Sequence, residues 1–190
     1  MNAIRERLQT VEEATFFHRD EVVTATGVVR TIEKKSEQDS ALQMVPVPRL
    51  HEEAILRLRT CHSESYEEAL LRVLIDWFAD EYYSLLPESI QCADCEKPVR
   101  VQTNGGYSLD STDPSPMKYS WYCSNCQKDV REEVRSLDNV GELMRLRSGM
   151  PMDFSKAFAL VARALGFEVR IVIGYYGMKS GWWNEVFIND

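Results

Sequence analysis

The fold is decided by MPMDFSKAFALVARALGFEVRIVIGYY, residues 150–176, which predicts a helix followed directly by a strand. In the first part, apolar residues recur at helical spacing and would share one face: Phe154, Phe158, Val161, Ala162 and Leu165. Pro151 suits the first turn of this helix, and Gly166 suits the left-handed position just past its end. Residues 169–176 and 182–188 predict two strands after the helix.

A second helix is predicted from Ser65 to about Leu86. Ser65 followed by Glu68 is a capping-box pattern, in which each side chain accepts a hydrogen bond from the backbone N–H of the other residue. One face of this helix is apolar and aromatic, and we expect it to be core: Leu70, Leu74, Trp77, Phe78 and Leu85. RLHEEAILRLRT, residues 49–60, begins an earlier helix.

Local composition predicts the structure of the N-terminal part. Residues 1–20 predict a short helix, and the β-branched stretch VVTATGVVRTI, residues 22–32, predicts a strand. KKSEQDS, residues 34–40, is typical of a polar loop, and VPVP, residues 45–48, is typical of an extended connector.

Four of the five cysteines form two C-x-x-C pairs separated by 27 residues: Cys92, Cys95, Cys123 and Cys126. Two such turns brought together supply the tetrahedral sulfur ligands that Zn²⁺ favours, which predicts one structural zinc ion per chain. Redox C-x-x-C motifs and disulfides are the alternatives. Neither pair sits at the strand-to-helix junction that a redox motif needs, and no other feature indicates secretion. Because a closed four-thiolate site leaves no coordination position open, the function must lie elsewhere.

The composition argues against several classes of protein. With 44% hydrophobic and 27% charged residues among 190, the chain can bury a core, and no segment approaches the roughly 18 apolar residues of a membrane span. The N-terminus has no apolar signal-peptide core, so we expect a cytoplasmic protein, with the nucleus as the alternative. A net charge of −8 and a pI near 5.0 argue against direct nucleic-acid binding, which relies on neutralising phosphates.

Three segments resemble cytosolic peptide:N-glycanase, a family of the transglutaminase-like superfamily: RSGMPMDFSKAF (147–158), ARALGFEVRIV (162–172) and WWNEVF (182–187). That family also carries two C-x-x-C pairs just upstream of this core. An aromatic amphipathic helix precedes its first pair, which WFADEYYSLLPESIQCADC (77–95) matches. The resemblance implies an α+β fold: a transglutaminase-like (papain-like cysteine-protease) core with an inserted four-cysteine zinc knuckle.

The resemblance also implies a domain organisation. It covers residues 45–190 in order and spacing, so residues 1–44 are predicted to be an N-terminal extension with a short helix and a strand. Within the core, residues 90–130 would form the zinc-binding segment. Residues 140–190 would form a truncated segment of one helix and the strands that follow it.

Each catalytic position of the family can be compared with the residue at the matching position of this sequence. Its nucleophile motif reads roughly Arg-x-Gly-x-Cys-x-Glu-aromatic, and four scaffold positions are matched here: Arg147, Gly149, Asp153 and Phe154. Pro151 holds the place of the nucleophilic cysteine. The general-base histidine stands three residues before an Asn/Thr-Glu-Val element, and here that position is Gly181, ahead of residues 184–186. The orienting aspartate should come well downstream, so Asp190 is too early to supply it.

No other residue is predicted to restore the site. Cys61, the fifth cysteine, adjoins His62, but neighbouring side chains rarely meet in catalytic geometry and this pair lies far upstream. The remaining candidates are expected to be solvated or structural: His18, His51, Ser148 and Asp153. Asp153 would stand at a helix N-terminus, where a carboxylate is favourable without any catalytic role.

These observations favour a non-catalytic, zinc-binding member of the family that binds proteins or serves as a structural subunit of an assembly. Adjacent strand residues point to opposite faces, so one of Trp182 and Trp183 can enter the core while the other reaches a partner surface. If residues 182–188 form a final strand, the sheet lacks the strand that usually follows in the family and has an unpaired edge. Either the chain is a fragment or a divergent short form, or, as we expect, another subunit supplies the missing strand. The alternative is an active peptide-N4-(N-acetyl-beta-glucosaminyl)asparagine amidase that deglycosylates misfolded glycoproteins through a rearranged site.

Overall fold

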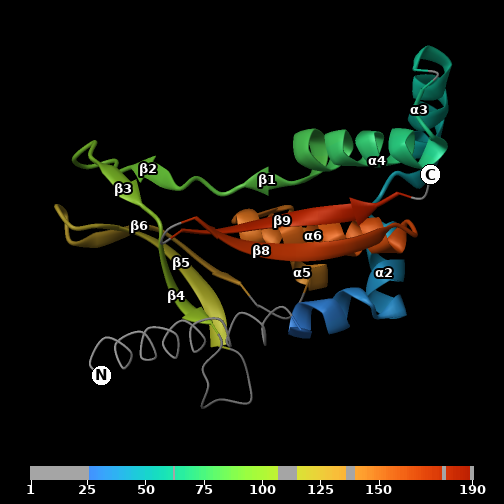
Figure 1. The fold of residues 1–190 in the computed structure, drawn as a ribbon. Helices are drawn as coiled ribbons and strands as arrows, with labels where there is room; N and C mark the ends of the chain where they lie inside the picture. Colours follow the sequence, from blue (N-terminus) through green and yellow to red (C-terminus); the bar gives the residue numbers. More distant parts are fainter. Residues whose placement is uncertain (1–25, 62, 107–114, 136–139, 177–178, 189–190) are drawn as a thin grey trace, which may run out of the picture. The chain divides into compact units, whose positions relative to one another are not determined.

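The computed structural model describes residues 26–61, 63–106, 115–135, 140–176 and 179–188 (Figure 1). The chain forms two compact units: the first comprises Met1–Arg30 and Glu88–Asp138, and the second comprises Thr31–Pro87 and Asn139–Asp190. The mixture of helices and strands confirms the predicted α+β class. No helix among the described residues is both long and apolar enough to cross a membrane.

Helix α6, Pro151–Ala164, is the centre of the second unit, and nine of its 14 residues are buried. It contacts five other elements: α2 (Lys35–Leu42), α5 (Val140–Leu146), β7 (Ser148–Gly149), β8 (Glu168–Tyr176) and β9 (Lys179–Phe187). Pro151 stands at its first position, and Gly166 has a φ of +91° just past its end. Both predicted helix signals are therefore confirmed.

Strands β8 and β9 confirm the two predicted strands, although β9 begins three residues earlier than predicted. They form an antiparallel ribbon in which Gly174 pairs with Gly181 and Ile173 pairs with Trp182. Helix α6 lies along one face of this ribbon (Figure 1). The side-chain amide of Asn184 in β9 donates a hydrogen bond of 3.0 Å to the carbonyl oxygen of Ser155 in α6. This bond ties the second strand to the helix.

Helix α4, Tyr66–Asp76, begins at the predicted N-cap. The hydroxyl oxygen of Ser65 accepts a hydrogen bond from the N–H of Glu68 at 3.2 Å. In return, the Glu68 carboxylate accepts one from the N–H of Ser65 at 2.8 Å. The capping box read from the sequence is therefore confirmed.

The second half of the predicted helix has a different structure. Trp77–Tyr82 form a π-helical turn, η1, and Ser84–Leu85 then form strand β1, which pairs in parallel with β7, Ser148–Gly149. The helix predicted to Leu86 is therefore wrong beyond Tyr82. Leu85 is 57% exposed and not in the core, because strand pairing replaces the last helical turn.

The aromatic face of this segment is core, as predicted. Phe78 is fully buried, and its ring centroid lies 5.4 Å from that of Tyr83, 5.0 Å from that of Phe154 and 5.4 Å from that of Phe158. Edge-to-face and offset contacts at these distances add to the free energy gained from area burial. The cluster joins the η1 turn to the first half of α6.

The polar loop predicted over residues 34–40 is wrong, because Lys35–Leu42 form helix α2. Ala41 is fully buried, and α2 packs against α6. Its exposed side carries an ion pair one turn apart, in which Lys35 Nζ lies 3.1 Å from Asp39 Oδ1. Polar composition describes the exposed side of a packed helix as well as it describes a loop.

The strand predicted over residues 22–32 is also wrong where the structure describes it, because residues 26–32 are helical. Val28 and Ile32, four residues apart, are buried, whereas Val29 is 44% exposed. This is a helical pattern and not an alternating one. β-branched residues lower helix propensity only slightly, and tertiary burial overrides so small a preference.

Helix α3, Val47–Thr60, contains the helix predicted from residue 49 and begins two residues earlier. The extended connector predicted over residues 45–48 is therefore wrong in its second half. Pro48 lies in the first turn of α3, where a proline lacks only an N–H that has no helical partner. The helix predicted over residues 1–20 lies outside the described residues.

Antiparallel strand pairs form the cysteine-containing part of the first unit. Its strands are β2 (Ser89–Gln91), β3 (Pro98–Arg100), β4 (Gln102–Gly106), β5 (Ser115–Cys123) and β6 (Lys128–Arg135). β2 and β3 flank the first C-x-x-C pair, while β4, β5 and β6 form an antiparallel sheet with the second pair at the turn from β5 to β6. Tyr119 and Trp121 of β5 are buried.

Gly149 lies where no side chain fits. A Cβ at this position would lie 2.5 Å from both Asp153 Cβ and Tyr83 Oη, so Gly149→Ala should force these groups apart. We expect a loss of about 1–3 kcal/mol in the free energy of unfolding, measured by urea titration. Gly181→Ala is the matched control, because the nearest heavy atom to its Cβ would lie at 3.9 Å. Equal urea midpoints for the two variants would contradict the close packing at Gly149.

Candidate metal centre and the first turn of helix α6

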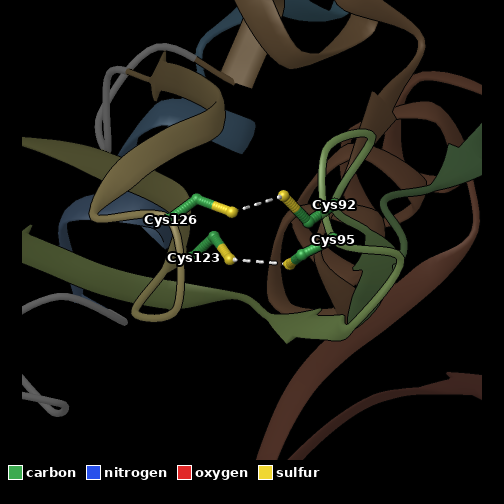
Figure 2. A group of neighbouring side chains, drawn as sticks. All are labelled: Cys92, Cys95, Cys123 and Cys126. Atoms are coloured by element: carbon green, nitrogen blue, oxygen red, sulfur yellow. Dashed lines mark hydrogen bonds between the residues drawn. The ribbon is translucent and has the colours of Figure 1, made fainter.

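The four cysteines of the two C-x-x-C pairs come together in the first unit (Figure 2). Their sulfur atoms all lie within 4.8 Å of one another. Cys92 Sγ is 3.8 Å from Cys126 Sγ, and Cys95 Sγ is 3.6 Å from Cys123 Sγ. A tetrahedral ion with metal–sulfur bonds of ~2.3 Å, the value for zinc, requires sulfur separations of about 3.8 Å. The sulfur cage therefore fits such an ion.

The hairpin turns explain how each pair presents its sulfur atoms. In the first turn, the N–H of Glu96 donates to the carbonyl oxygen of Cys92 at 2.8 Å. In the second, Cys123 at the end of β5 pairs with Lys128 at the start of β6. Glu96 and Gln127, each directly after the second cysteine of its turn, have φ angles of 56° and 52°. This left-handed residue reverses the chain, and both sulfur atoms of each turn face the other turn (Figure 2).

The sulfur cage is electrostatically uneven. The backbone N–H of Lys97 and the neighbouring thiols lower the pKa of Cys95 to about 7. The hydrogen bond with Cys95 and then burial raise the pKa of Cys126 to about 12. Near neutral pH the Cys126 thiol therefore retains its proton, and a metal ion that binds its sulfur atom must displace that proton.

The two alternatives to a metal site lose support from this geometry. All five cysteines are free thiols, and separations of 3.6 and 3.8 Å are far longer than the ~2.05 Å of a disulfide bond. Each C-x-x-C pair lies in a strand-to-strand turn and not at the start of a helix, where a redox thiolate would be stabilised.

The first turn of α6 carries no nucleophile at the position where the resemblance places one. Pro151 occupies the first helical position and is exposed. Asp153 is buried, and its Oδ2 accepts a hydrogen bond of 3.0 Å from the N–H of Met150. Asp153 therefore caps the helix N-terminus, in agreement with the structural role expected for it.

The position assigned to the general base also lacks a side chain. Gly181 pairs with Gly174 across the ribbon, and the ring of Trp183 lies so close to Gly174 that a Cβ there would be 2.5 Å from it. Trp183 is 44% exposed, and its indole N–H donates to the Glu185 carboxylate at 3.4 Å. Hydrogen bonds from Arg170 and Trp183 lower the pKa of Glu185. Polar contacts thus hold an aromatic ring at the surface.

Sequence reasoning missed Lys156. This lysine is fully buried in α6, and its Nζ lies 5.9 Å from the centroid of the Trp182 ring, within cation–π range. Trp182 is half-buried and Trp183 more exposed. A single lysine in an apolar helix normally indicates an exposed position, so nothing in the sequence signalled this burial.

Two cavities border Phe154, the aromatic residue of the family motif. One has a volume of about 730 Å³ and is bordered by Tyr82, Tyr83 and Arg147 among others. The other, of about 250 Å³, is largely apolar; its lining includes Ile75, Phe158, Trp182 and Trp183. Cys61 lines neither cavity.

His51 lies at the wrong end of α6 to act beside Pro151. Its Nδ1 is hydrogen-bonded to the hydroxyl of Tyr66, and it borders a cavity that also contacts Leu165 and Gly166. Those two residues follow the C-terminal end of α6. A helix of 14 residues is about 21 Å long, so His51 is far from the first turn.

The other substitutes also occupy structural positions or are not described. Cys61 is the C-cap residue of α3, and Ser148 Oγ donates to the carbonyl oxygen of Leu146 at 3.3 Å. Three residues lie outside the described part of the chain: His18, His62 and Asp190. Sequence reasoning also missed the polar residues around the cysteines, although they repeat between the two turns.

Comparison with known proteins places the chain in a family. A model of the transglutaminase-like superfamily matches residues 110–190. The peptide-N(4)-(N-acetyl-beta-glucosaminyl)asparagine amidase of Homo sapiens is 28% identical over 84% of this chain and 25% of its own length. The rat enzyme of the same name is 27% identical over 79% and 23%, and protein png-1 of Neurospora crassa is 23% identical over 78% and 38%.

The chain is therefore a peptide:N-glycanase-like member of the transglutaminase-like superfamily, which confirms the resemblance read from its sequence. It spans about a quarter of the length of the amidases that it matches.

Removal of one sulfur ligand should release the metal. We expect the protein to bind one metal ion per chain and Cys92→Ser to weaken binding more than about a hundredfold, because a ligand is lost outright. Elemental analysis after gel filtration measures this. Cys61→Ser is the matched control, because Cys61 lies outside the cluster, and it should keep the full metal content. Equal metal content in the two variants would exclude the four-cysteine site.

Metal affinity should fall as the pH is lowered. Since the Cys126 thiol retains its proton near neutral pH, the metal must displace it, and each displaced proton makes metal affinity fall roughly tenfold per pH unit as the pH is lowered. We expect a fall of at least about tenfold from pH 8 to pH 7, measured by competition with a chelator of known affinity at each pH. An affinity independent of pH would mean that the thiols are already ionised.

Proposed function

We propose that this protein is a non-catalytic member of its family, in which a structural zinc ion holds the first unit and the second unit binds protein partners. One observation carries the proposal: the first turn of α6 and the facing strand β9 have Pro151 and Gly181 where the family's nucleophile and base would stand. Neither residue has a side-chain group that can attack a carbonyl or move a proton.

Packing does not explain why a glycine stands at position 181. The nearest heavy atom to a Cβ there would be 3.9 Å away, so contacts do not exclude a Cβ, and the missing side chain is consistent with a position that no longer needs a base. The capping by Asp153 and the packing at Gly149 keep the first turn of α6 in order without a cysteine. Loss of a nucleophile and its base together costs on the order of 10⁶-fold in rate in well-studied hydrolases.

Zinc is the ion that suits the sulfur cage. Four thiolates from two tight turns favour a soft or borderline ion in tetrahedral geometry, and zinc has no redox chemistry that would oxidise them. With all four positions taken by protein, the ion would have no place for water or substrate. Its role would be to hold the hairpin of β2 and β3 against the turn between β5 and β6.

A partner surface would include the exposed ring of Trp183. Trp183 and Ile75, both 44% exposed, border the apolar cavity beside Phe154. Exposed aromatic residues beside such a cavity are typical anchors in protein interfaces. With reduced cysteines and an acidic charge, we propose a cytoplasmic protein that contacts other proteins in an assembly and not nucleic acid.

The amidase activity named for the relatives gives the test. We expect no conversion of the glycosylated asparagine to aspartate when the protein is incubated with a denatured N-glycopeptide and followed by mass spectrometry. An active amidase serves as the positive control. Release above background would overturn the non-catalytic proposal, and release abolished by Cys61→Ala would identify a displaced nucleophile.

Partner binding is tested with a pair of surface variants. Trp183→Ala should lose proteins that the wild type retains in affinity capture, whereas Phe187→Ala should keep them. Phe187 is 50% exposed on the same strand but borders a different cavity, so it is a matched control. Identical captured proteins for both variants would count against Trp183 as an anchor.

A further inference from the structure

The two cysteine turns repeat a longer pattern than C-x-x-C. Residues 92–97 read CADCEK and residues 123–128 read CSNCQK. Position three is an aspartate or its amide, position five is a glutamate or its amide, and position six is lysine in both. The repeat therefore includes polar residues that do not ligate the metal.

The repeated residues have the same backbone roles in both turns. Position five, Glu96 or Gln127, is left-handed in each turn, with φ angles of 56° and 52°. Position six pairs with the first cysteine: the N–H of Cys92 donates to the carbonyl oxygen of Lys97 at 3.0 Å, and Cys123 pairs with Lys128. The two turns are thus two copies of one local structure.

The copies face each other through reciprocal contacts. Sulfur atoms pair first to fourth in both directions, Cys92 with Cys126 and Cys123 with Cys95. The polar residues pair third to sixth in both directions. Lys128 forms an ion pair with Asp94, and Lys97 Nζ donates to the side-chain oxygen of Asn125 at 3.1 Å. A local twofold relationship between the turns accounts for all four pairings.

The lysines also lie where positive charge would be electrostatically favourable. Zinc bound by four thiolates carries a net charge of about −2, which two nearby ammonium groups would offset. Lys97 and Lys128 each stand two residues after the second cysteine of their turn, close to the cage.

We propose that Asp94–Lys128 and Lys97–Asn125 form a polar clamp that holds the two turns together around the metal and slows its release. This inference rests on the zinc site of the proposed function. Lys128 and Asp94 side chains are 48% and 53% exposed, and exposed ion pairs contribute little to folding free energy. The clamp joins two separate turns, so its effect falls on the step in which the turns part and the ion leaves.

The rate of metal release tests the clamp. Zinc-loaded protein is mixed with an excess of a chromophoric chelator, and the absorbance of the chelate is followed. Lys128→Gln should release zinc about tenfold faster than wild type, at the lower end of the effect of groups that support metal ligands. Higher salt should accelerate release from wild type more than from Lys128→Gln, because only wild type has the ion pair.

Two further variants separate the clamp from general effects of charge. Lys118→Gln removes the same charge from another exposed pair of the first unit, Lys118–Glu132, at 2.7 Å, and should leave the rate unchanged. Asp94→Asn makes the first pair chemically like Lys97–Asn125, so it should release zinc more slowly than Asp94→Ala. A urea midpoint equal to that of wild type in each zinc-loaded variant shows that the fold is kept.

The outcomes distinguish the clamp from the site itself. Wild type that takes up no zinc would overturn the zinc proposal. Zinc-loaded wild type whose release rate matches those of Lys128→Gln and Asp94→Ala would overturn the clamp and leave the site intact. Equal acceleration by Lys118→Gln and Lys128→Gln would also overturn it, because net charge alone would then explain the rate.

Discussion

The burial of α6 is the constraint on which the second unit depends. Helices α2 and α5 and the β8–β9 ribbon all pack against it, and nine of its 14 residues are removed from solvent. Backbone N–H groups at the N-terminus of α6 need hydrogen-bond acceptors within this packing. The Asp153 carboxylate supplies one by accepting a hydrogen bond from the N–H of Met150. That capping brings Asp153 and Tyr83 against Gly149, where only a hydrogen can fit. Neither of these contacts involves the side chain of Pro151.

The first unit uses a different means of stabilisation. Its hairpins are short, and the buried side chains include two of the cysteines, Cys92 and Cys123. A small unit with little apolar core commonly needs a metal ion or disulfides, because the area buried on folding cannot offset the chain entropy. A metal ion bound by the four cysteines would meet this need, and the repeated turns explain how two hairpins of different length can present the same geometry to one ion.

Prediction succeeded where the signal is local and failed where it depends on packing. Ser65 with Glu68 and Pro151 with Gly166 mark helix ends through contacts within a few residues, and all four are found in those roles. The β-branched segment containing Val28 was predicted as a strand although it is helical, because burial of Val28 and Ile32 on one helical face outweighs the weak strand preference of such residues. The end of the helix at Tyr82 was not predicted because it depends on a distant contact. The strand β1 that follows pairs with β7, more than sixty residues away in the sequence.

By itself, the sequence determined which side chains stand at the metal-ligand positions and at the positions where the family resemblance places a nucleophile and a base. The spacing of four cysteines, the proline at residue 151 and the glycine at residue 181 are readable without coordinates, because ligand type and side-chain chemistry belong to single residues. Only the tertiary structure decided that the sulfur atoms meet at 3.6 and 3.8 Å, that Lys156 is buried beside Trp182, and that Lys97 and Lys128 reach across to the opposite turn. These pairings join segments distant in the chain, and their distances follow from how hairpins and helices pack and not from any local pattern.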